Sequence, residues 1–272
     1  MISFKKINQE VVKPIKLPVI KHEDIKGCNL FPEIYANIFL CAKKKSGKTS
    51  TIYKIIKSCI NKNTKIIVFC STCNKDKNWM AIKKWLISKK IHNEFYTSIH
   101  DNEALLTLIN ELQALEFENE INSSDSEEEK EDQIIKFDKK IQSYKVYIRK
   151  PKKIAPEYVI IFDDLSLELK DKNIAHLLKT NRHYKSKVII SSQYINDLLP
   201  EARKQMDYVL LFGGHNVAKL EEIYNWSDLN ISFEEFVNIY KKATKEKYNF
   251  LYIDTNNSEF RRNFSDLIIL SS

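Results

Sequence analysis

The stretch at positions 37–51 limits the possible folds of this 272-residue chain more than any other part of it. Its apolar run Ile38–Ala42 predicts a buried strand, and a basic loop and the start of a helical pattern follow directly. The loop ends in Ser46-Gly47-Lys48-Thr49, which matches the end of the phosphate-binding pattern G-x-x-x-x-G-K-S/T. In such a loop, backbone N–H groups surround the phosphates, a lysine reaches the terminal phosphates and a hydroxyl binds Mg²⁺. We therefore expect a strand, a phosphate-binding loop and a helix in this order.

Ala42 stands at the first glycine position of the pattern, so the match is incomplete. Alanine is the smallest substitute, and the loop can still close on a less permissive backbone. Taken without the rest of the chain, the stretch also fits a lysine-rich surface turn. The residues that would contact a bound nucleotide are Ala42, Lys43, Lys44, Lys45, Ser46, Gly47, Lys48, Thr49 and Ser50. Lys48 would reach the β- and γ-phosphates, and Thr49 would be a magnesium ligand.

Two later apolar runs also end in polar side chains. The run 157–164 contains four consecutive apolar residues, which is typical of a strand buried on both faces, and it ends in Asp163 and Asp164. The run 187–193 is a second buried strand, and it ends in Gln193. Open α/β sheets bind ligands at the carboxyl ends of their strands. We expect Asp163 to hold Mg²⁺ through water, Asp164 to orient or deprotonate the attacking water, and Gln193 to bridge that water and the γ-phosphate.

Arginine is rare in this chain, which uses lysine for most of its surface charge. The five arginines are at positions 149, 182, 203, 261 and 262. An arginine in this setting indicates a need for a planar, bidentate donor. Arg182 and Arg203 flank the strand that ends in Gln193, so both are candidates for an arginine finger, and a finger acting in trans would require a ring of subunits. The alternative for each is an ion pair with a structural carboxylate. We interpret His183 as a helix cap or an interface residue, not as a catalytic one.

The remaining chain alternates strands with helices, which predicts an α/β fold with a mainly parallel sheet and helices on both faces. Beyond the first strand and loop, the expected strands are 65–70, 95–97, 157–164, 187–193, 208–212 and 248–253. The expected helices are 49–59, 78–90, 102–117, 134–148, 173–181, 217–225 and 232–243. Residues 1–36 contain three prolines, so we expect an extended arm there and a single α/β domain over 37–272.

The net charge of +8 is unevenly distributed along the chain. Glu116–Asp132 contains nine acidic residues and one lysine, so the remainder carries a net charge of +16. A basic remainder suits a polyanionic partner, although a solvated lysine surface explains it equally well. The insert at about 119–133 lacks an apolar period, and we expect it to be disordered or solvated. An acidic gate that competes with DNA is its functional alternative.

Other features exclude several classes of protein. No stretch approaches the ~20 apolar residues of a membrane span, and the first residues lack the apolar core of a signal peptide, so we expect a soluble, intracellular protein. The five cysteines are an odd number without a framework spacing, and we expect them to be reduced and structural. Cys70-Ser-Thr-Cys73 has the C-x-x-C spacing, but no second cysteine or histidine pair completes a zinc site.

Taken together, the motifs resemble those of the poxvirus-type genome-packaging ATPases of the FtsK–HerA superfamily, which occur in large DNA viruses, virophages and related elements. The resemblance covers about residues 38–264 without the acidic insert. The stretches that carry it are A-K-K-K-S-G-K-T, V-I-I-F-D-D-L, N-R-H-Y-K-S-K-V-I-I-S-S-Q, L-L-P-E-A-R-K-Q-M-D and Y-N-F-L-Y-I-D followed by F-R-R-N-F. The Arg-His pair followed by the strand ending in Ser-Ser-Gln is the most specific of these.

This resemblance implies a P-loop NTPase fold of the RecA/FtsK–HerA type that uses ATP and Mg²⁺. It also implies a homo-oligomeric ring that translocates double-stranded DNA into a capsid, with a capsid or portal-vertex protein as a further partner. The host cytoplasm (the viral factory) and the virion are the expected locations. The positions that match the family's nucleotide site are Lys48, Thr49, Asp163, Asp164 and Gln193. Arg182 or Arg203 would be the trans-acting arginine.

Two other functions remain open at this point. A nucleotide-dependent DNA-binding or capsid-assembly module without turnover is supported by Ala42 and by the three lysines at 43–45, where small residues are usual in the family. A small-molecule kinase would need a lid with several arginines near the phosphates, and the five arginines of the chain are not clustered in that way.

Overall fold

The computed structural model describes residues 20–122, 133–138, 143–148 and 153–270 of the chain. Its main sheet consists of β1 (Asn37–Cys41), β2 (Lys65–Cys70), β3 (Asn93–Tyr96), β6 (Tyr158–Asp163), β7 (Ser186–Ser192), β8 (Tyr208–Phe212), β9 (Phe250–Asp254), β10 (Glu259–Arg262) and β11 (Asp266–Leu267). The strand order is β11-β10-β9-β8-β1-β7-β6-β2-β3. All pairs from β3 to β8 are parallel, and the pairs from β8 to β11 are antiparallel. The sheet is therefore mixed but mainly parallel, as predicted.

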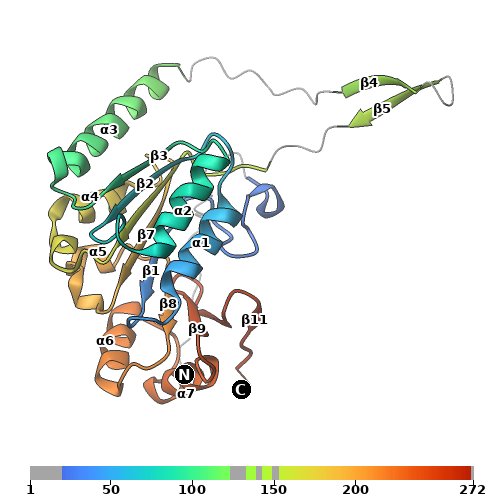
Figure 1. Cartoon of the computed structure of the whole chain (residues 1–272). Coiled ribbons are helices and arrows are strands. Elements are labelled where there is room, and N and C mark those ends of the chain that lie inside the picture. Colours follow the sequence, from blue (N-terminus) through green and yellow to red (C-terminus); the bar gives the residue numbers. More distant parts are fainter. Residues whose placement is uncertain (1–19, 123–132, 139–142, 149–152, 271–272) are drawn as a thin grey trace, which may run out of the picture.

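Helices cover both faces of this sheet (Figure 1). They are α1 (Lys48–Cys59), α2 (Lys77–Ser88), α3 (Ala104–Asn122), α4 (Lys172–Thr180), α5 (Pro200–Arg203), α6 (Val217–Ser227) and α7 (Phe233–Ala243). The apolar sides of α1 and α2 pack on one face, and those of α3, α4, α6 and α7 pack on the other. The predicted layer arrangement is confirmed.

Strand geometry divides the core into two halves. Successive side chains of a strand point to opposite faces. In β1, Ile38 and Leu40 accordingly join the core under α1 and α2, whereas Phe39 and Cys41 join the core under the other helices. A strand buried on both sides requires the continuous apolar run that the sequence shows.

The described part of the predicted N-terminal arm packs against the sheet. Leu30 and Phe31 are buried, and the ring centroid of Phe31 lies 5.0 Å from that of Tyr208 and 5.7 Å from that of Phe264. A parallel bridge joins Ile25 to Ile154. Residues 25–36 therefore share the core of the α/β domain, and residues 1–19 lie outside the described part.

The prediction of a helix over 134–148 is wrong. This segment forms an antiparallel hairpin of β4 (Gln133–Asp138) and β5 (Ser143–Ile148), in which Ile134 pairs with Tyr147. The segment is rich in β-branched and aromatic residues, which favour strands. The sequence prediction also missed β10 and β11, which are short, and α3 extends five residues past its predicted end at Phe117. The acidic residues 123–132 lie outside the described part of the chain.

The five cysteines are all free thiols, and Cys41, Cys59, Cys70 and Cys73 are buried. Burial raises the pKa of Cys41 to about 12, and it also raises the pKa of Cys70 to about 12. Such thiols are not reactive at neutral pH, as expected of structural cysteines. Among the described residues, no three His, Cys, Asp or Glu side chains are grouped as metal ligands, and no helix is both long and apolar enough to cross a bilayer.

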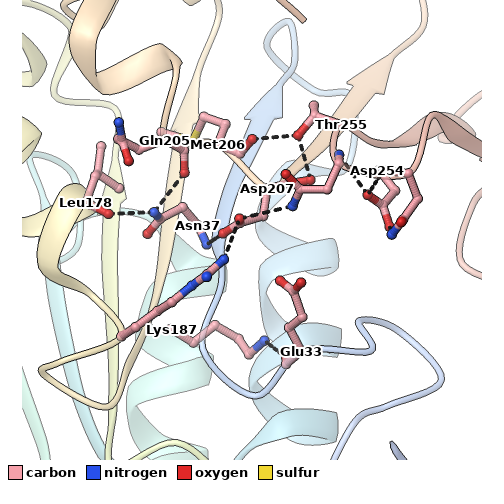
Figure 2. A network of polar contacts seen from close by, with 12 residues as sticks. Glu33, Asn37, Leu178, Lys187, Gln205, Met206, Asp207, Asp254 and Thr255 are labelled. Carbon is pink, nitrogen blue, oxygen red and sulfur yellow. Dashed lines mark hydrogen bonds and ion pairs between the residues drawn. The ribbon is translucent and has the colours of Figure 1, made fainter. Parts of the chain in front are cut away.

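A buried polar network ties the sheet together at the amino ends of β1 and β8 (Figure 2). The Asp207 carboxylate accepts a 2.8 Å hydrogen bond from the backbone N–H of Asn37. The Asn37 amide donates at 2.8 Å to both the Leu178 and the Gln205 carbonyl oxygens. The Thr255 hydroxyl donates to the Asp207 carbonyl oxygen at 3.0 Å. These bonds hold the start of β1 in register with α4, β8 and the end of β9, and so help to fix the strand that leads into the loop.

We expect Asp207→Ala to lower the free energy of unfolding by about 2–3 kcal/mol, because the buried N–H of Asn37 loses a charged acceptor. Chemical denaturation with a constant m-value would measure the loss. Asp207→Asn, which keeps one acceptor oxygen, should cost clearly less. An alanine variant as stable as the parent would show that the network contributes little.

Candidate functional site

A cleft of about 520 Å³ opens at the carboxyl ends of β1 and β6. The predicted site residues that line it are Lys44, Lys45, Gly47, Lys48, Thr49, Ser50, Asp163 and Asp164. The other side of the cleft comes from the β2–α2 connection and the start of α2, with Thr72, Lys75, Asp76, Asn78 and Trp79. Its volume lies in the range of small-molecule sites. The structure therefore brings the loop and the two aspartates together, as the sequence predicted.

The loop tolerates Ala42 because the backbone does not need a glycine there. Ala42 is buried in the core, does not adopt a positive φ, and its N–H donates to the Ser192 carbonyl oxygen at 3.0 Å. The left-handed positions of the loop are Lys45 (φ 62°) and Gly47 (φ 97°). Gly47 is the N-cap of α1, directly before Lys48, and its positive φ favours glycine. The replacement of the first motif glycine by Ala42 therefore causes no backbone strain in the loop.

Lys48 projects from the first turn of α1 between the two aspartates. Its Nζ lies 3.0 Å from Asp163 Oδ1 and donates a hydrogen bond to Asp164 Oδ1. Burial lowers the pKa of Lys48, but the charges of Asp163 and Asp164 and the hydrogen bond to Asp164 outweigh it and raise the pKa above its ordinary value. Lys48 is therefore a fixed cation at neutral pH, held at the mouth of the loop.

Asp163 is anchored by Trp79, which lies in the helix expected over 78–90 and has no site role in the sequence motifs. The indole N–H of Trp79 donates to Asp163 Oδ2 at 2.8 Å, and both side chains are buried. Asp76 caps α2 by accepting from the backbone N–H groups of Asn78 and Trp79, which sets the helix start beside β6. A buried tryptophan usually donates its N–H to a hydrogen-bond acceptor. The sequence therefore indicates that Trp79 has an acceptor, but it does not indicate which residue this is.

Thr49 and Asp163 fit a magnesium ion. Mg²⁺ prefers oxygen ligands and binds through one or two side chains, water and substrate phosphates. Asp163 Oδ1 is buried and faces Lys48 as an ion pair without a well-formed hydrogen bond. Thr49 lines the same cleft. These two side chains would hold the ion, which would offset the charge of the β- and γ-phosphates.

Asp164 and Gln193 follow the ends of β6 and β7. Asp164 has a φ of 54°, and its carbonyl oxygen accepts a 2.8 Å hydrogen bond from the Ser71 hydroxyl. Gln193 directly follows Ser192, which pairs with Cys41 at the end of β1. β7 thus lies between the loop strand and the aspartate strand, and Gln193 emerges between them. Gln193 is beside the cleft but does not line it.

Neither arginine candidate lies in this cleft. Arg182 precedes β7 and is at the amino ends of the parallel strands, roughly 20 Å from the loop by the length of β7. Its side chain is 64% exposed, and its Nη2 donates to Asp207 Oδ1 at 3.4 Å. Arg203 is partly buried, and its Nε donates to the Leu198 carbonyl oxygen at 3.0 Å. From its position at the amino ends of the strands, the Arg182 side chain cannot reach the loop of its own subunit. His183 pairs with Glu116 at 3.2 Å, in a surface contact between α3 and the end of α4.

The three loop lysines have different surroundings. Lys44 and Lys45 line the cleft, whereas the Lys43 side chain lies against Gly214, after β8. Near it, the buried imidazole of His215 donates from Nε2 to the Cys41 carbonyl oxygen at 3.3 Å. Burial, only partly offset by this hydrogen bond, lowers the pKa of His215 to about 4, so the imidazole is neutral at pH 7. No sequence motif identifies His215 as a support of the loop strand.

We expect Trp79→Phe to raise the Mg²⁺ concentration needed for half-maximal ATP turnover about 10-fold, because Asp163 loses the donor that orients it. Turnover measured over a Mg²⁺ series would show the shift. Trp85→Phe is the matched control, since Trp85 is on the same helix and packs edge-on against Tyr53 instead. Equal Mg²⁺ curves for the two variants would rule out a positioning role for Trp79.

Comparisons with known proteins identify one matching family and one related viral protein. A family model described as Poxvirus A32 protein matches residues 104–265. A 69-residue stretch is 35% identical to Uncharacterized protein 015R of Frog virus 3 (isolate Goorha), and the match covers 24% of this chain and 21% of that protein. The chain thus spans about a fifth of that relative's length.

Solved structures share the fold at low sequence identity. The genome packaging NTPase B204 of Sulfolobus turreted icosahedral virus 2, in complex with AMPPCP, is 20% identical, with a TM-score of 0.52 over 88% of this chain and 100% of that one. B204, the DNA-packaging ATPase of Sulfolobus turreted icosahedral virus, is 18% identical, with a TM-score of 0.52 over 84% and 96%. The cytoplasmic domain of the Type VII secretion ATPase EccC of Thermomonospora curvata is 10% identical, with a TM-score of 0.51 over 87% and 26%.

Proposed function

Because this chain belongs to the Poxvirus A32 protein family, we propose that it is an ATPase that moves double-stranded DNA into a viral capsid. Membership confirms the family resemblance of the motifs, and the fold of the NTPase neighbours confirms the expected P-loop NTPase architecture. The observation that carries the proposal is the cleft in which Lys48 faces Asp163 and Asp164 beside the loop. The B204 enzymes are described as genome- and DNA-packaging, and one is solved with ATP-γS.

In the proposed reaction, the loop backbone and Lys48 bind the β- and γ-phosphates of ATP. The ammonium that pairs with Asp163 and Asp164 would turn toward phosphate oxygens, where it offsets the charge that develops in the transition state. Asp164 is then free to orient the attacking water or to accept its proton, and its side chain is partly open to solvent. Gln193 would bridge that water and the γ-phosphate.

A positive group for the γ-phosphate would come from a neighbouring subunit. The described cleft contains no arginine, and Arg182 and Arg203 lie elsewhere in the fold. In a head-to-tail ring, one surface of each subunit meets a different surface of the next. Arg182 is the better placed of the two, because it is exposed at the edge opposite the cleft and only weakly held. The proposal therefore includes a homo-oligomeric ring.

The remaining parts of the proposal concern partners and location. The net charge of +16 outside Glu116–Asp132 supports binding to DNA phosphates. The ring would bind a capsid or portal-vertex protein. It would act in the viral factory of the host cytoplasm or in the virion. We keep 37–272 as the ATPase domain, with the packed residues 25–36 as its N-terminal border.

DNA-stimulated ATP hydrolysis tests this function. The purified full chain should release inorganic phosphate from ATP only with Mg²⁺, and the rate should rise when linear double-stranded DNA is added. Since phosphate contacts depend on salt, the stimulation should fall between 50 and 200 mM salt. Hydrolysis that is unaffected by DNA at low salt would contradict the packaging function.

The two alternatives predict different results. A module without turnover requires ATP binding and forbids hydrolysis, so binding and phosphate release must be measured separately. Ala42 no longer favours the module without turnover, because it fits the loop without strain. A small-molecule kinase would show phosphate transfer to nucleosides, but no arginine lid lines the cleft within the described residues.

A further inference from the structure

Tyr248 lies beside the phosphate-binding loop, although it is about 200 residues away in sequence. It precedes β9, whose first residue, Phe250, pairs with Phe212 at the carboxyl end of β8. β8 is the direct neighbour of β1. The segment before β9 is therefore at the same edge of the sheet as the loop.

The Tyr248 ring contacts the loop at Gly47. A Cβ atom added to Gly47 would lie 3.3 Å from Tyr248 Cδ1, so the ring packs directly over the backbone at which α1 begins. Despite this contact, Tyr248 is 58% exposed. One side of the ring is thus fixed against the loop, and much of the remaining ring surface is open.

The backbone of Tyr248 is strained. Its φ of 73° lies in the left-handed region, which bulky residues rarely adopt. The turn is held by Asn263, whose side chain accepts from the Phe250 N–H at 3.2 Å and donates to Asn249 Oδ1 at 2.9 Å. Glycine or asparagine would suit such a φ better, so an exposed aromatic ring there needs a reason other than folding. Strained residues of this kind gather at ligand sites.

We propose that Tyr248 is the platform on which the base of the bound nucleotide stacks. This inference rests on the proposed function, in which the phosphates occupy the loop. Gly47 lines the phosphate cleft and also touches Tyr248, so a nucleotide bound through its phosphates has an aromatic surface within reach of its base. Lys247 Nζ lies over this ring, 4.8 Å from its centroid, and this flexible side chain would move aside when a base stacks there.

Stacking on a tyrosine is tolerant of base identity, because every base offers a π-face. The platform would therefore accept adenine and guanine similarly, and base selection would need hydrogen bonds from other groups. Removing such a platform typically lowers affinity about 5- to 150-fold.

The test compares nucleotides with a ligand that has the phosphates but no base. Equilibrium dialysis with Mg²⁺ would measure binding of ATP, GTP and inorganic tripolyphosphate to the parent protein, Tyr248→Phe and Tyr248→Ala. We expect Tyr248→Ala to weaken ATP and GTP binding about 10-fold and to leave tripolyphosphate binding unchanged. Tyr248→Phe should bind all three ligands like the parent. Phe117→Ala, which truncates an exposed aromatic residue of α3, is the control for general effects.

The outcomes separate this inference from the proposed function. A parent protein that binds ATP, with unchanged ATP affinity in Tyr248→Ala, overturns the platform alone. An equal loss of ATP and tripolyphosphate binding in that variant also overturns it, because the residue would then only support the loop. A parent protein that binds neither ATP nor tripolyphosphate overturns the proposed function as well.

Discussion

Lys48→Ala should reduce ATP turnover by about 10²–10³-fold or more, because the substitution removes the cation that would meet the developing charge on the γ-phosphate. The ammonium is already positioned in the cleft by Asp163 and Asp164, so little reorganisation is needed when phosphates bind. Phosphate release at saturating ATP, with and without double-stranded DNA, is the measurement.

Lys48 also separates two carboxylates, and its loss leaves the buried Asp163 without its counter-charge. A melting curve must therefore accompany the assay, and Lys48→Arg, which keeps the charge, should be more stable than Lys48→Ala. Lys54→Ala is the matched control, since Lys54 is an exposed lysine of the same helix. DNA-stimulated turnover that persists in folded Lys48→Ala would remove the loop from the mechanism.

The cleft beside the loop could be predicted from the sequence because its parts are at strand ends. Parallel strands bring their carboxyl ends to one edge of the sheet. This edge therefore holds Lys48, Asp163 and Asp164 independently of how the side chains of the core pack. The order of the strands was not predictable from these motifs, and it places β7 between the loop strand and the aspartate strand. That order is why Gln193 emerges next to Ala42.

Other parts of the site depend on tertiary contacts that leave no local pattern. Trp79 has helical spacing with its apolar neighbours, and only the packing of α2 against β6 shows that its N–H serves Asp163. Tyr248 reads as part of a strand, although its backbone is left-handed and its ring lies on the loop. The hairpin of β4 and β5 was misread because apolar residues two apart and four apart overlap in a short segment.

Arg182→Ala should lower ATP turnover by about 10³-fold or more while nucleotide affinity stays within a few-fold of the parent, because a trans-acting arginine acts mainly in the transition state. Arg182 is exposed at the edge opposite the cleft, which would face a neighbour's cleft in a head-to-tail ring. Arg203 donates to its own Leu198 carbonyl oxygen, so Arg203→Ala should have the smaller effect on turnover. Lys179→Ala, at an exposed lysine of the same edge, controls for lost surface charge.

A mixing experiment shows whether Arg182 acts on a neighbouring subunit. Lys48→Ala subunits keep Arg182, and Arg182→Ala subunits keep Lys48, so a mixed ring contains interfaces in which an intact cleft meets an intact arginine. Turnover should therefore reappear when two inactive variants are combined, and it should depend on their ratio. If mixtures stay inactive although mixed rings form, Arg182 does not act in trans. If Arg182→Ala alone retains full turnover, the cleft obtains its positive charge elsewhere, and the lysines Lys44 and Lys45 that line it become the first groups to replace.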